Sequence, residues 1–309
     1  MINKPLVSVI VPVYNGVKAG VENCIKSLLN QDYKNFEIIA IDDMSDDNSY
    51  DFLKKKFGNK HNIIITKNKK RESVIGTCNN GIKIAKGKYV FRTDQDTIYE
   101  KNVLSELIKV ITQYNDVAGV GCKLYYPNSN KIRALGIKIN KLIYTSKVVG
   151  RNEIDRGQYD KIIEVDSLIG GAMMMKMDVL KKIGGFNEKY ILYYNEVDWC
   201  LNAKKMGFRV LHVPTARAKK GGIEKELSSF SLYHMLRDKI TFMKLHANKL
   251  IYYIFIFGAF LSIPIKVIRF ALINRFDLIK AQVKGVWIGI LYNETKYNKR
   301  SFIDGLKDI

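Results

Sequence analysis

The chain has 309 residues, of which 47% are hydrophobic and 26% charged, and this ordinary composition excludes a wholly disordered protein. It is long enough for one large domain with an appendage, or for two domains. The formal net charge of +21 favours a polyanionic partner, such as nucleic acid, anionic lipid or a phosphorylated small molecule, unless the lysines only cover solvated surfaces.

The four cysteines are scattered through the chain, and none stands at Cys-x-x-Cys spacing. They therefore indicate neither a zinc site nor a disulfide framework. An apolar strand begins a few residues after Met1, and from this start we expect no signal peptide. Together these features predict a protein of the reducing cytoplasm.

The first 125 residues alternate between apolar runs and segments with helical periodicity. The runs are apolar throughout, which predicts strands covered on both faces in a mostly parallel sheet flanked by helices, an α/β architecture. We expect Gly87 to end one of the helices. The expected strands are residues 7–13, 36–41, 63–66, 89–92 and 117–124, and the expected helices are residues 21–29, 49–57, 79–85 and 103–111.

The middle of the chain is less regular. Residues 127–166 combine polar turns with short alternating runs, which predicts a loop-rich insertion of the kind that often determines specificity. Beyond it we expect a short helix capped by Asp178, a helix over residues 196–206 and a strand over residues 209–213.

Residues 226–309 are the most apolar part of the chain and also the densest in positive charge, so we expect a helical tail separate from a first domain over residues 1–225. Residues 251–265 carry no charge, whereas a membrane span needs roughly 20 apolar residues. Residues 278–290 place apolar side chains on one side and lysines on the other, which predicts an amphipathic helix on an anionic membrane surface. The alternative is a helical hairpin packed on the first domain.

Three of the predicted strands end in polar residues, and the carboxyl ends of parallel strands meet at one edge of a sheet, where α/β proteins bind ligands. Asp94 and Asp96 are hard oxygen ligands that suit Mg²⁺ or Mn²⁺ bridging a pyrophosphate, unless they only cap a turn. The polar residues are Pro12, Tyr14 and Asn15 after the first strand, Asp42 and Asp43 after the second, and Asp94 and Asp96 after the fourth.

Arg71 lies in a lysine-rich loop and could neutralise a phosphate, although a solvated side chain is the favoured interpretation. A second acidic group, Glu196 and Asp198, stands at a predicted helix start beside Trp199. One carboxylate could take a proton from a hydroxyl while the aromatic side chains stack on a sugar ring. The alternative is that the carboxylates only complement the helix dipole.

At this point the chain resembles the inverting, GT-A-type glycosyltransferases of family 2, the rhamnosyltransferase-like members in particular. The matching segments run in family order across roughly residues 5–220. They are VSVIVPVYNG (7–16), IDDMSDDNS (41–49), NNGI (79–82), AKGKYV (85–90), DQD (94–96), GGAMM (170–174), GGFNE (184–188) and NEVDWC (195–200).

The resemblance implies a GT-A fold in the first domain and a role for each matched residue. Pro12, Tyr14 and Asp42 or Asp43 would hold the nucleotide, Asp94 the sugar donor, and Asp96 a Mn²⁺ or Mg²⁺ ion. Glu196 would be the general base, with Asp198 as its rival, and Gly171 and Trp199 would lie near the acceptor. Where the family often has a metal-binding His, this chain has Lys219 and Lys220, which could stabilise the leaving diphosphate directly.

The expected function is therefore transfer of a sugar from a nucleotide-diphosphate donor to a glycan or lipid-linked acceptor of the cell envelope, with inversion. The expected location is the cytoplasm, peripherally on the inner face of the cell membrane. A nucleotidyltransferase and a non-catalytic, membrane-attached relative are the alternatives. We expect no nucleic-acid partner, because basic and aromatic residues are not interleaved.

Overall fold

The computed structural model describes residues 4–221 and 227–291. It divides into two compact units, a sheet unit (residues 1–139, 146–187 and 196–222) and a helical unit (residues 140–145, 188–195 and 223–309). The expected boundary between residues 225 and 226 lies outside the described residues.

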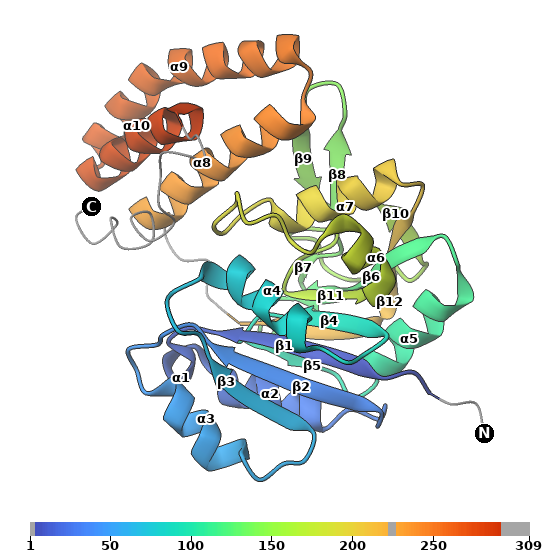
Figure 1. Cartoon of the computed structure of the whole chain (residues 1–309). Coiled ribbons are helices and arrows are strands. Elements are labelled where there is room, and N and C mark those ends of the chain that lie inside the picture. Colours follow the sequence, from blue (N-terminus) through green and yellow to red (C-terminus); the bar gives the residue numbers. More distant parts are fainter. Residues whose placement is uncertain (1–3, 222–226, 292–309) are drawn as a thin grey trace. The chain divides into compact units, whose positions relative to one another are not determined.

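The sheet unit contains a mixed, ten-stranded sheet in the order β10-β12-β6-β11-β4-β1-β2-β3, with β5 paired to β12 and β7 paired to β6 (Figure 1). Its strands are β1 (Val7–Val13), β2 (Phe36–Asp42), β3 (Ile63–Lys67), β4 (Tyr89–Thr93), β5 (Thr97–Tyr99), β6 (Val117–Tyr125), β7 (Ile132–Ala134), β10 (Ile163–Val165), β11 (Ala172–Lys176) and β12 (Arg209–Lys220). A separate ribbon pairs β8 (Ile137–Asn140) with β9 (Thr145–Val148).

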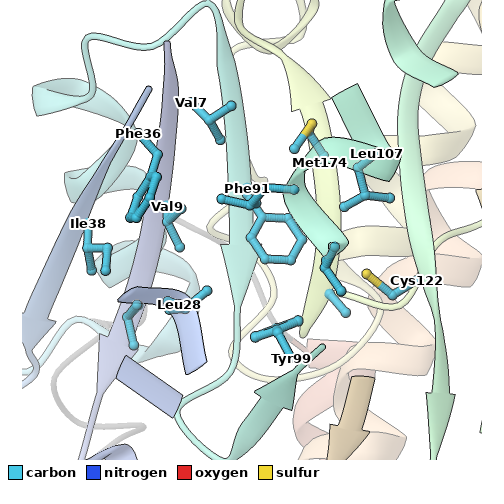
Figure 2. Packing of buried hydrophobic residues seen from close by; sticks show 14 of the residues in the cluster. Val7, Val9, Leu28, Phe36, Ile38, Phe91, Tyr99, Leu107, Cys122 and Met174 are labelled. Carbon is cyan, nitrogen blue, oxygen red and sulfur yellow. The ribbon is translucent and has the colours of Figure 1, made fainter. Parts of the chain in front are cut away.

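Helices cover both faces of the sheet, as the continuous apolar strands predict. Val7 and Val9 of β1 pack with Leu28 in one large hydrophobic cluster (Figure 2), whereas Ile10 lies against Gly81 of α4. The helices of this unit are α1 (Gly16–Ala19), α2 (Val21–Leu29), α3 (Ser49–Phe57), α4 (Ser73–Ile84), α5 (Val103–Gln113), α6 (Met177–Ile183) and α7 (Asn195–Lys205).

The sheet is less parallel than the sequence suggests, because β11 runs antiparallel between β4 and β6. The neighbouring pairs of β1 with β2, β1 with β4, and β2 with β3 are parallel, as expected. The Gly-Gly segment before β11 carries no periodic signal, so the sequence does not predict this strand. Its insertion brings the Gly170-Gly171 turn beside the end of β4.

Several helix bounds differ from the prediction by a few residues, α4 begins at Ser73 instead of residue 79, and Gly87 and Asp178 do not have the helix-end roles expected of them. The helix expected to stop at Gly87 is α4, which ends at Ile84 because Ala85 turns to extended backbone (φ −67°, ψ 132°). Gly87 instead permits a close approach, since a Cβ there would lie 2.6 Å from the backbone nitrogen of Ser8. Asp178 is not the cap of α6 either: Lys176 is the N-cap residue, and Asp178 lies inside the first turn.

The helical unit contains α8 (Ser229–His246), α9 (Lys249–Leu272) and α10 (Phe276–Leu291), and α10 packs along α8 (Figure 1). The close approach depends on two glycines. A Cβ on Gly285 would lie 2.9 Å from the carbonyl oxygen of Tyr233, and one on Gly289 would lie 2.9 Å from the Ile240 side chain. Glycine is tolerated here because packing of the two helices offsets its low helix propensity.

This packing divides the apolar face that the sequence predicts for residues 278–290. Leu278, Gln282 and Val286 are buried, whereas Val283 and Trp287 are 45% and 56% exposed. Helix α9 differs from both its neighbours: it is long and apolar enough to cross a membrane by length and composition, and none of its most apolar 18-residue window is buried. The apolar C-terminal helix expected from sequence is confirmed.

Helix α8 contributes a buried ion pair to the helical unit. Arg237 Nη1 donates to Asp238 Oδ1 at 2.5 Å, and the two side chains are 1% and 0% exposed. The Asp238 carboxylate also accepts backbone N–H groups of Ile191, Leu192 and Tyr193 at 2.9–3.4 Å. One carboxylate therefore organises an irregular loop.

Candidate active site

The turns after β1, β2 and β4 are joined by hydrogen bonds at the carboxyl edge of the sheet. The Asn15 backbone N–H donates to Ser45 Oγ at 2.9 Å, and the Asp46 N–H donates to Asn15 Oδ1 at 2.9 Å. The Gln95 amide pairs with the backbone of Tyr14, accepting from its N–H at 2.9 Å and donating to its C=O at 2.8 Å. Sequence reasoning missed Gln95, whose role depends on a residue 81 positions away.

Pro12 lies in β1 where the strand loses its pairing with β4, which ends at Ile10. A proline at this point removes no hydrogen bond from that side of the ladder. The chain then turns sharply at Asn15, which adopts a left-handed conformation with φ 49°. Pro12 and Asn15 therefore shape the turn that presents Tyr14.

The Tyr14 ring carries the Arg71 guanidinium on one face, with 3.9 Å between Cζ and the ring centroid. Arg71 Nη1 also donates to Tyr14 Oη at 3.0 Å, and Tyr14 Oη donates to Asp46 Oδ2 at 3.1 Å. Burial raises the pKa of Tyr14, which Arg71 only partly counteracts. The expectation of a solvated Arg71 is wrong, because the side chain is half-buried against the ring.

Asp42 and Asp43 are both buried but differ in their hydrogen bonds. Asp43 Oδ1 accepts from Asn68 Nδ2 and from the Glu72 N–H, each at 2.8 Å. Asp42 Oδ2 accepts from the Ser45 N–H at 3.1 Å, but buried Oδ1 has no hydrogen-bond partner in the part of the chain that the structure describes. A buried acceptor without a donor costs about 1–3 kcal/mol. Asp42 is therefore the carboxylate available for a ligand.

Asp94 and Asp96 lie on either side of one ammonium group. Lys220 Nζ donates to Asp94 Oδ2 and lies 3.2 Å from Asp96 Oδ1, and its side chain is 16% exposed. Burial raises the pKa of Asp94, but Lys220 and then Arg92 outweigh it and hold the pKa below its usual value. Burial likewise lowers the pKa of Lys220, and the two carboxylates reverse this effect.

The structure separates the two lysines that the sequence places together. Successive residues of a strand point to opposite faces, so Lys219 of β12 faces away from the carboxylates that Lys220 contacts. Lys219 is exposed and lines a cavity of 350 Å³ with Glu100, Tyr125, Arg217 and other residues. Of the two lysines that the resemblance suggests for the leaving diphosphate, Lys220 is the one that contacts Asp94 and Asp96.

The Gly170-Gly171 turn lies over β4. The Asp94 N–H donates to the Gly171 C=O at 3.3 Å, and a Cβ on Gly171 would collide with Asp94 Oδ2. Beneath Gly170 lies Arg92, which is 4% exposed and has its guanidinium 4.7 Å from the centroid of the Phe186 ring. The sequence signal for Arg92 was a charge inside an apolar strand.

Arg92 connects the two acidic groups electrostatically. Burial lowers its pKa, but Cys78, Glu196 and Asp94 raise it above the usual value. Glu196, at the start of α7, is half-buried, whereas Asp198 is 3% exposed and accepts from Asn202 Nδ2 at 3.3 Å. Glu196 is thus the more accessible carboxylate of the pair.

Trp199 does not face a ligand, contrary to expectation. Its side chain is 0% exposed, and it lies so close to β6 that a Cβ on Gly119 would be 3.4 Å from its ring carbon Cζ3. Glu196 and Trp199 are neighbours at three-residue spacing on α7, but Glu196 lies at the partly exposed start of the helix whereas the Trp199 ring packs against β6. It is a core residue.

The residues around Asp94 do not fit a resident divalent cation. Mg²⁺ prefers octahedral oxygen ligands, and Mn²⁺ also suits carboxylate and water sites. Asp94 and Asp96 supply two carboxylates, but a positively charged ammonium lies between them. Among residues 4–221 and 227–291, no group of three or more His, Cys, Asp or Glu residues is placed to hold a metal ion.

Sequence comparison finds a family model and curated relatives that match part of the chain. The family model described as "Glycosyl transferase family 2" matches residues 8–184. Glycosyltransferase GlyG of Streptococcus pneumoniae is 31% identical over 125 residues, which cover 40% of this chain and 41% of that protein. The Escherichia coli protein WfaP, named as a UDP-Glc:alpha-D-GlcNAc-diphosphoundecaprenol beta-1,3-glucosyltransferase, is 37% identical over 103 residues, covering 33% of this chain and 40% of WfaP. The chain thus spans about two fifths of each relative.

Structural comparison confirms the GT-A fold. The mannosyltransferase PcManGT of Pyrobaculum calidifontis, in complex with GDP-Man and Mn²⁺, has a TM-score of 0.60 at 16% identity, and the match covers 93% of this chain and 88% of PcManGT. For TarS of S. aureus with UDP-GlcNAc the TM-score is 0.56 at 19% identity, and the match covers 79% of this chain and 68% of TarS. For GalNAc-T7 with UDP, GalNAc and Mn²⁺ the TM-score is 0.61 at 17% identity, and the match covers 77% of this chain and 48% of GalNAc-T7. At these identities the likeness concerns the fold.

Proposed function

Because the chain belongs to glycosyl transferase family 2, we propose that it transfers a sugar from a nucleotide-diphosphate donor to a hydroxyl group of a glycan or lipid-linked acceptor. The observation that carries this proposal is the buried Asp42 oxygen without a donor, at the same sheet edge as the Asp94–Lys220–Asp96 cluster. The Gln95–Tyr14 hydrogen bonds connect the turn after β1 to the turn after β4. The Asp42 oxygen suits the nucleoside end of a nucleoside diphosphate, and the Asp94–Lys220–Asp96 cluster suits its diphosphate end.

In this proposal the nucleoside lies at the ends of β1 and β2. Asp42 Oδ1 accepts a base N–H or a ribose hydroxyl, which removes the cost of its missing hydrogen bond. The Tyr14 ring and the Arg71 guanidinium stacked on it lie beside the nucleoside. Pro12 and Asn15 act through the turn, and Asp43 acts through its hydrogen bonds to Asn68 and Glu72.

The donor sugar lies against the Gly170-Gly171 turn. Gly171 lets the Asp94 carboxylate lie directly against the turn, because a Cβ there would collide with Asp94 Oδ2. In this position Asp94 accepts hydrogen bonds from hydroxyls of the sugar, and hydrogen bonds to a carboxylate are among the stronger ones. The diphosphate then extends toward Lys220.

Transfer proceeds as a single displacement at the anomeric carbon. Glu196 accepts the proton of the acceptor hydroxyl as its oxygen bonds to that carbon from the side opposite the diphosphate. The bond between the carbon and the diphosphate oxygen breaks, and its electron pair leaves with the diphosphate. The configuration inverts. Glu196 helps to raise the pKa of buried Arg92, so a positively charged side chain lies near the proposed base.

We propose a lipid-linked acceptor and a peripheral location on the inner face of the cell membrane. WfaP is named for a diphosphoundecaprenol acceptor, and α9 exposes an apolar surface suited to a bilayer. The rhamnosyltransferase-like subtype stays a prediction, since none of the named relatives carries it. The cofactor expectation of Mn²⁺ or Mg²⁺ draws support from PcManGT and GalNAc-T7 and is opposed by the position of Lys220.

The test is turnover of a panel of UDP-, GDP- and dTDP-sugars by the purified full chain, with a polyprenyl-diphosphate sugar as acceptor. We expect release of one nucleoside diphosphate, formation of an extended lipid-linked product, and loss of both in Asp42→Ala. Binding of the same nucleoside diphosphates by calorimetry is the second readout. If no member of the panel is bound or turned over, the proposal is wrong. Nucleotidyl transfer would instead release pyrophosphate or a nucleoside monophosphate.

A further inference from the structure

We propose that the Lys220 ammonium is the cation that neutralises the donor diphosphate, so that this enzyme binds its donor and transfers the sugar without Mn²⁺ or Mg²⁺. This inference rests on the proposed function. It concerns the place where Lys220 meets Asp94 and Asp96, which in an enzyme of this kind using a metal would hold the ion.

The ammonium already occupies the space between the carboxylates. Lys220 Nζ donates a hydrogen bond to Asp94 Oδ2 and lies 3.2 Å from Asp96 Oδ1. A divalent cation bound to the same oxygens would lie almost in contact with Nζ, and the repulsion between unscreened like charges at that distance is strong. Binding a metal therefore requires Lys220 to leave both carboxylates.

The surrounding backbone holds Lys220 in place. Strand β12 pairs with β5 so that Lys220 lies opposite Thr97, and the Gly221 N–H donates to the Asp96 C=O at 2.8 Å. The Gly171 turn closes another side, since a Cβ there would lie 3.0 Å from Nζ. These contacts fix the strand end and leave the ammonium little alternative space.

The ammonium can reach a third partner. A lysine has three N–H donors, and two of them are directed at Asp94 and Asp96. Among residues 4–221 and 227–291 no other side chain or carbonyl accepts from this ammonium, so the third N–H can donate to an oxygen of the diphosphate. Three cations act on Asp94, namely Lys220, Arg92 and Arg133, so the positive charge near the leaving group does not depend on an ion from solution.

The reaction balances without a metal. The acceptor oxygen forms its bond to the anomeric carbon while the bond from that carbon to the diphosphate breaks. The proton goes to Glu196, and the electron pair stays on the departing diphosphate oxygen. Lys220 donates a hydrogen bond to that oxygen as negative charge develops on it, which is worth more in the transition state than before it.

The experiment compares the full chain with Lys220→Ala, Lys220→Arg and Lys220→His, and uses Lys219→Ala as the matched control on the opposite face of β12. Calorimetry measures binding of UDP, GDP and dTDP with EDTA and with Mn²⁺, and turnover of the accepted donor is measured under the same conditions. Thermal unfolding of each variant shows whether it folds. Electron paramagnetic resonance of Mn²⁺ titrated into each protein alone reports metal binding without activity.

We expect wild-type binding and turnover to be equal within about twofold in EDTA and in Mn²⁺. Removing one hydrogen-bond donor to the transition state typically lowers kcat about 100- to 1,000-fold. We expect a loss of this size for Lys220→Ala in EDTA. Lys220→Arg, which keeps the positive charge, should restore part of the activity. Lys219→Ala should behave as wild type. Lys220→His, which completes a His and two Asp ligands, should gain Mn²⁺ binding that wild type lacks.

Two results would overturn the inference. If wild type binds Mn²⁺ by itself, or if it needs Mn²⁺ for nucleotide binding or turnover, Lys220 does not replace the cation, and the proposed function stands. If none of the nucleotides binds with or without Mn²⁺, both the proposed function and the role of Lys220 are wrong. Equal losses in Lys219→Ala and Lys220→Ala would likewise contradict a specific role for Lys220.

Discussion

The sheet unit and the helical unit each contain a carboxylate paired with a basic side chain, and the two pairs differ in hydrogen-bonding capacity. In the helical unit Asp238 is fully buried and accepts Arg237 and three backbone N–H groups. In the sheet unit Lys220 keeps one N–H donor beyond Asp94 and Asp96, and these side chains stay 16–31% exposed. A buried carboxylate that accepts several donors holds a loop in place, whereas an ammonium with spare donor capacity at a partly exposed edge can bind a ligand.

The largest effect should come from the base of the sheet unit. Loss of a positioned general base costs about 100- to 10,000-fold, which is the fall in kcat expected for Glu196→Gln. Nucleoside diphosphate binding, measured by calorimetry, should be unchanged, since Glu196 acts on the acceptor. Asp198→Asn is the control, because Asp198 is buried against Asn202. Near-normal transfer by Glu196→Gln with none by Asp198→Asn would reverse the assignment.

The second prediction compares how much each ion pair, Arg237–Asp238 and Lys220–Asp96, contributes to the free energy of unfolding. Removing one partner of a buried pair leaves an uncompensated charge and costs about 3–5 kcal/mol, the loss expected for Asp238→Ala. Asp96→Ala should cost only about 1 kcal/mol or less, as for other partly exposed pairs, while lowering transfer. Chemical denaturation followed by circular dichroism measures both. Similar losses for the two variants would show that the two ion pairs do not differ in their contribution to stability.

A third prediction uses two buried histidines, one in each unit. Burial, and then Lys123 for His212 and Arg237 for His234, lowers both pKa values from 6.5 to about 3. A depressed pKa means that the unfolded chain takes up the proton first, so stability is present above about pH 6.5 and is lost as pH falls toward 3. The slope is about 1.4 kcal/mol per pH unit for each histidine.

His212→Leu and His234→Leu should each flatten the pH dependence of the unfolding free energy in that window, and the double variant should flatten it further. Denaturant titrations at half-unit steps of pH measure the slopes. Ile64→Ala, at an exposed and non-titrating position of the sheet unit, is the control and should leave the slope as in wild type. An unchanged slope in the double variant would mean that other groups govern acid unfolding.

The smallest effect concerns the exposed surface of α9. Phe257 and Leu261 are 65% and 61% exposed, and burying one such side chain in a lipid surface contributes about 1.5–3 kcal/mol, or roughly tenfold or more in partitioning. Phe257→Ser and Leu261→Ser should therefore each weaken sedimentation with anionic vesicles, with unfolding free energies within about 0.5 kcal/mol of wild type. Ile64→Ser, exposed on the sheet unit, is the control. Unaltered vesicle binding in all three would show that α9 is not the attachment surface.

Sequence reasoning was strongest where the signal was local. Continuous apolar runs predicted the buried strands, and the polar residues that follow them do lie at one sheet edge, where Gln95 bonds to Tyr14. It failed where a contact joined distant residues. The stacking of Arg71 on Tyr14 and the burial of Trp199 against β6 each depend on a tertiary partner that spacing along the chain does not encode.

The Asp238 carboxylate has a consequence for amide hydrogen exchange. Exchange is slow where an N–H group is hydrogen-bonded and away from water, and irregular loops usually exchange fast. Residues 191–193 belong to no helix or strand, yet their N–H groups donate to a carboxylate that is 0% exposed. These three amides should exchange as slowly as those of a packed helix, and they should become fast together when that single side chain is lost.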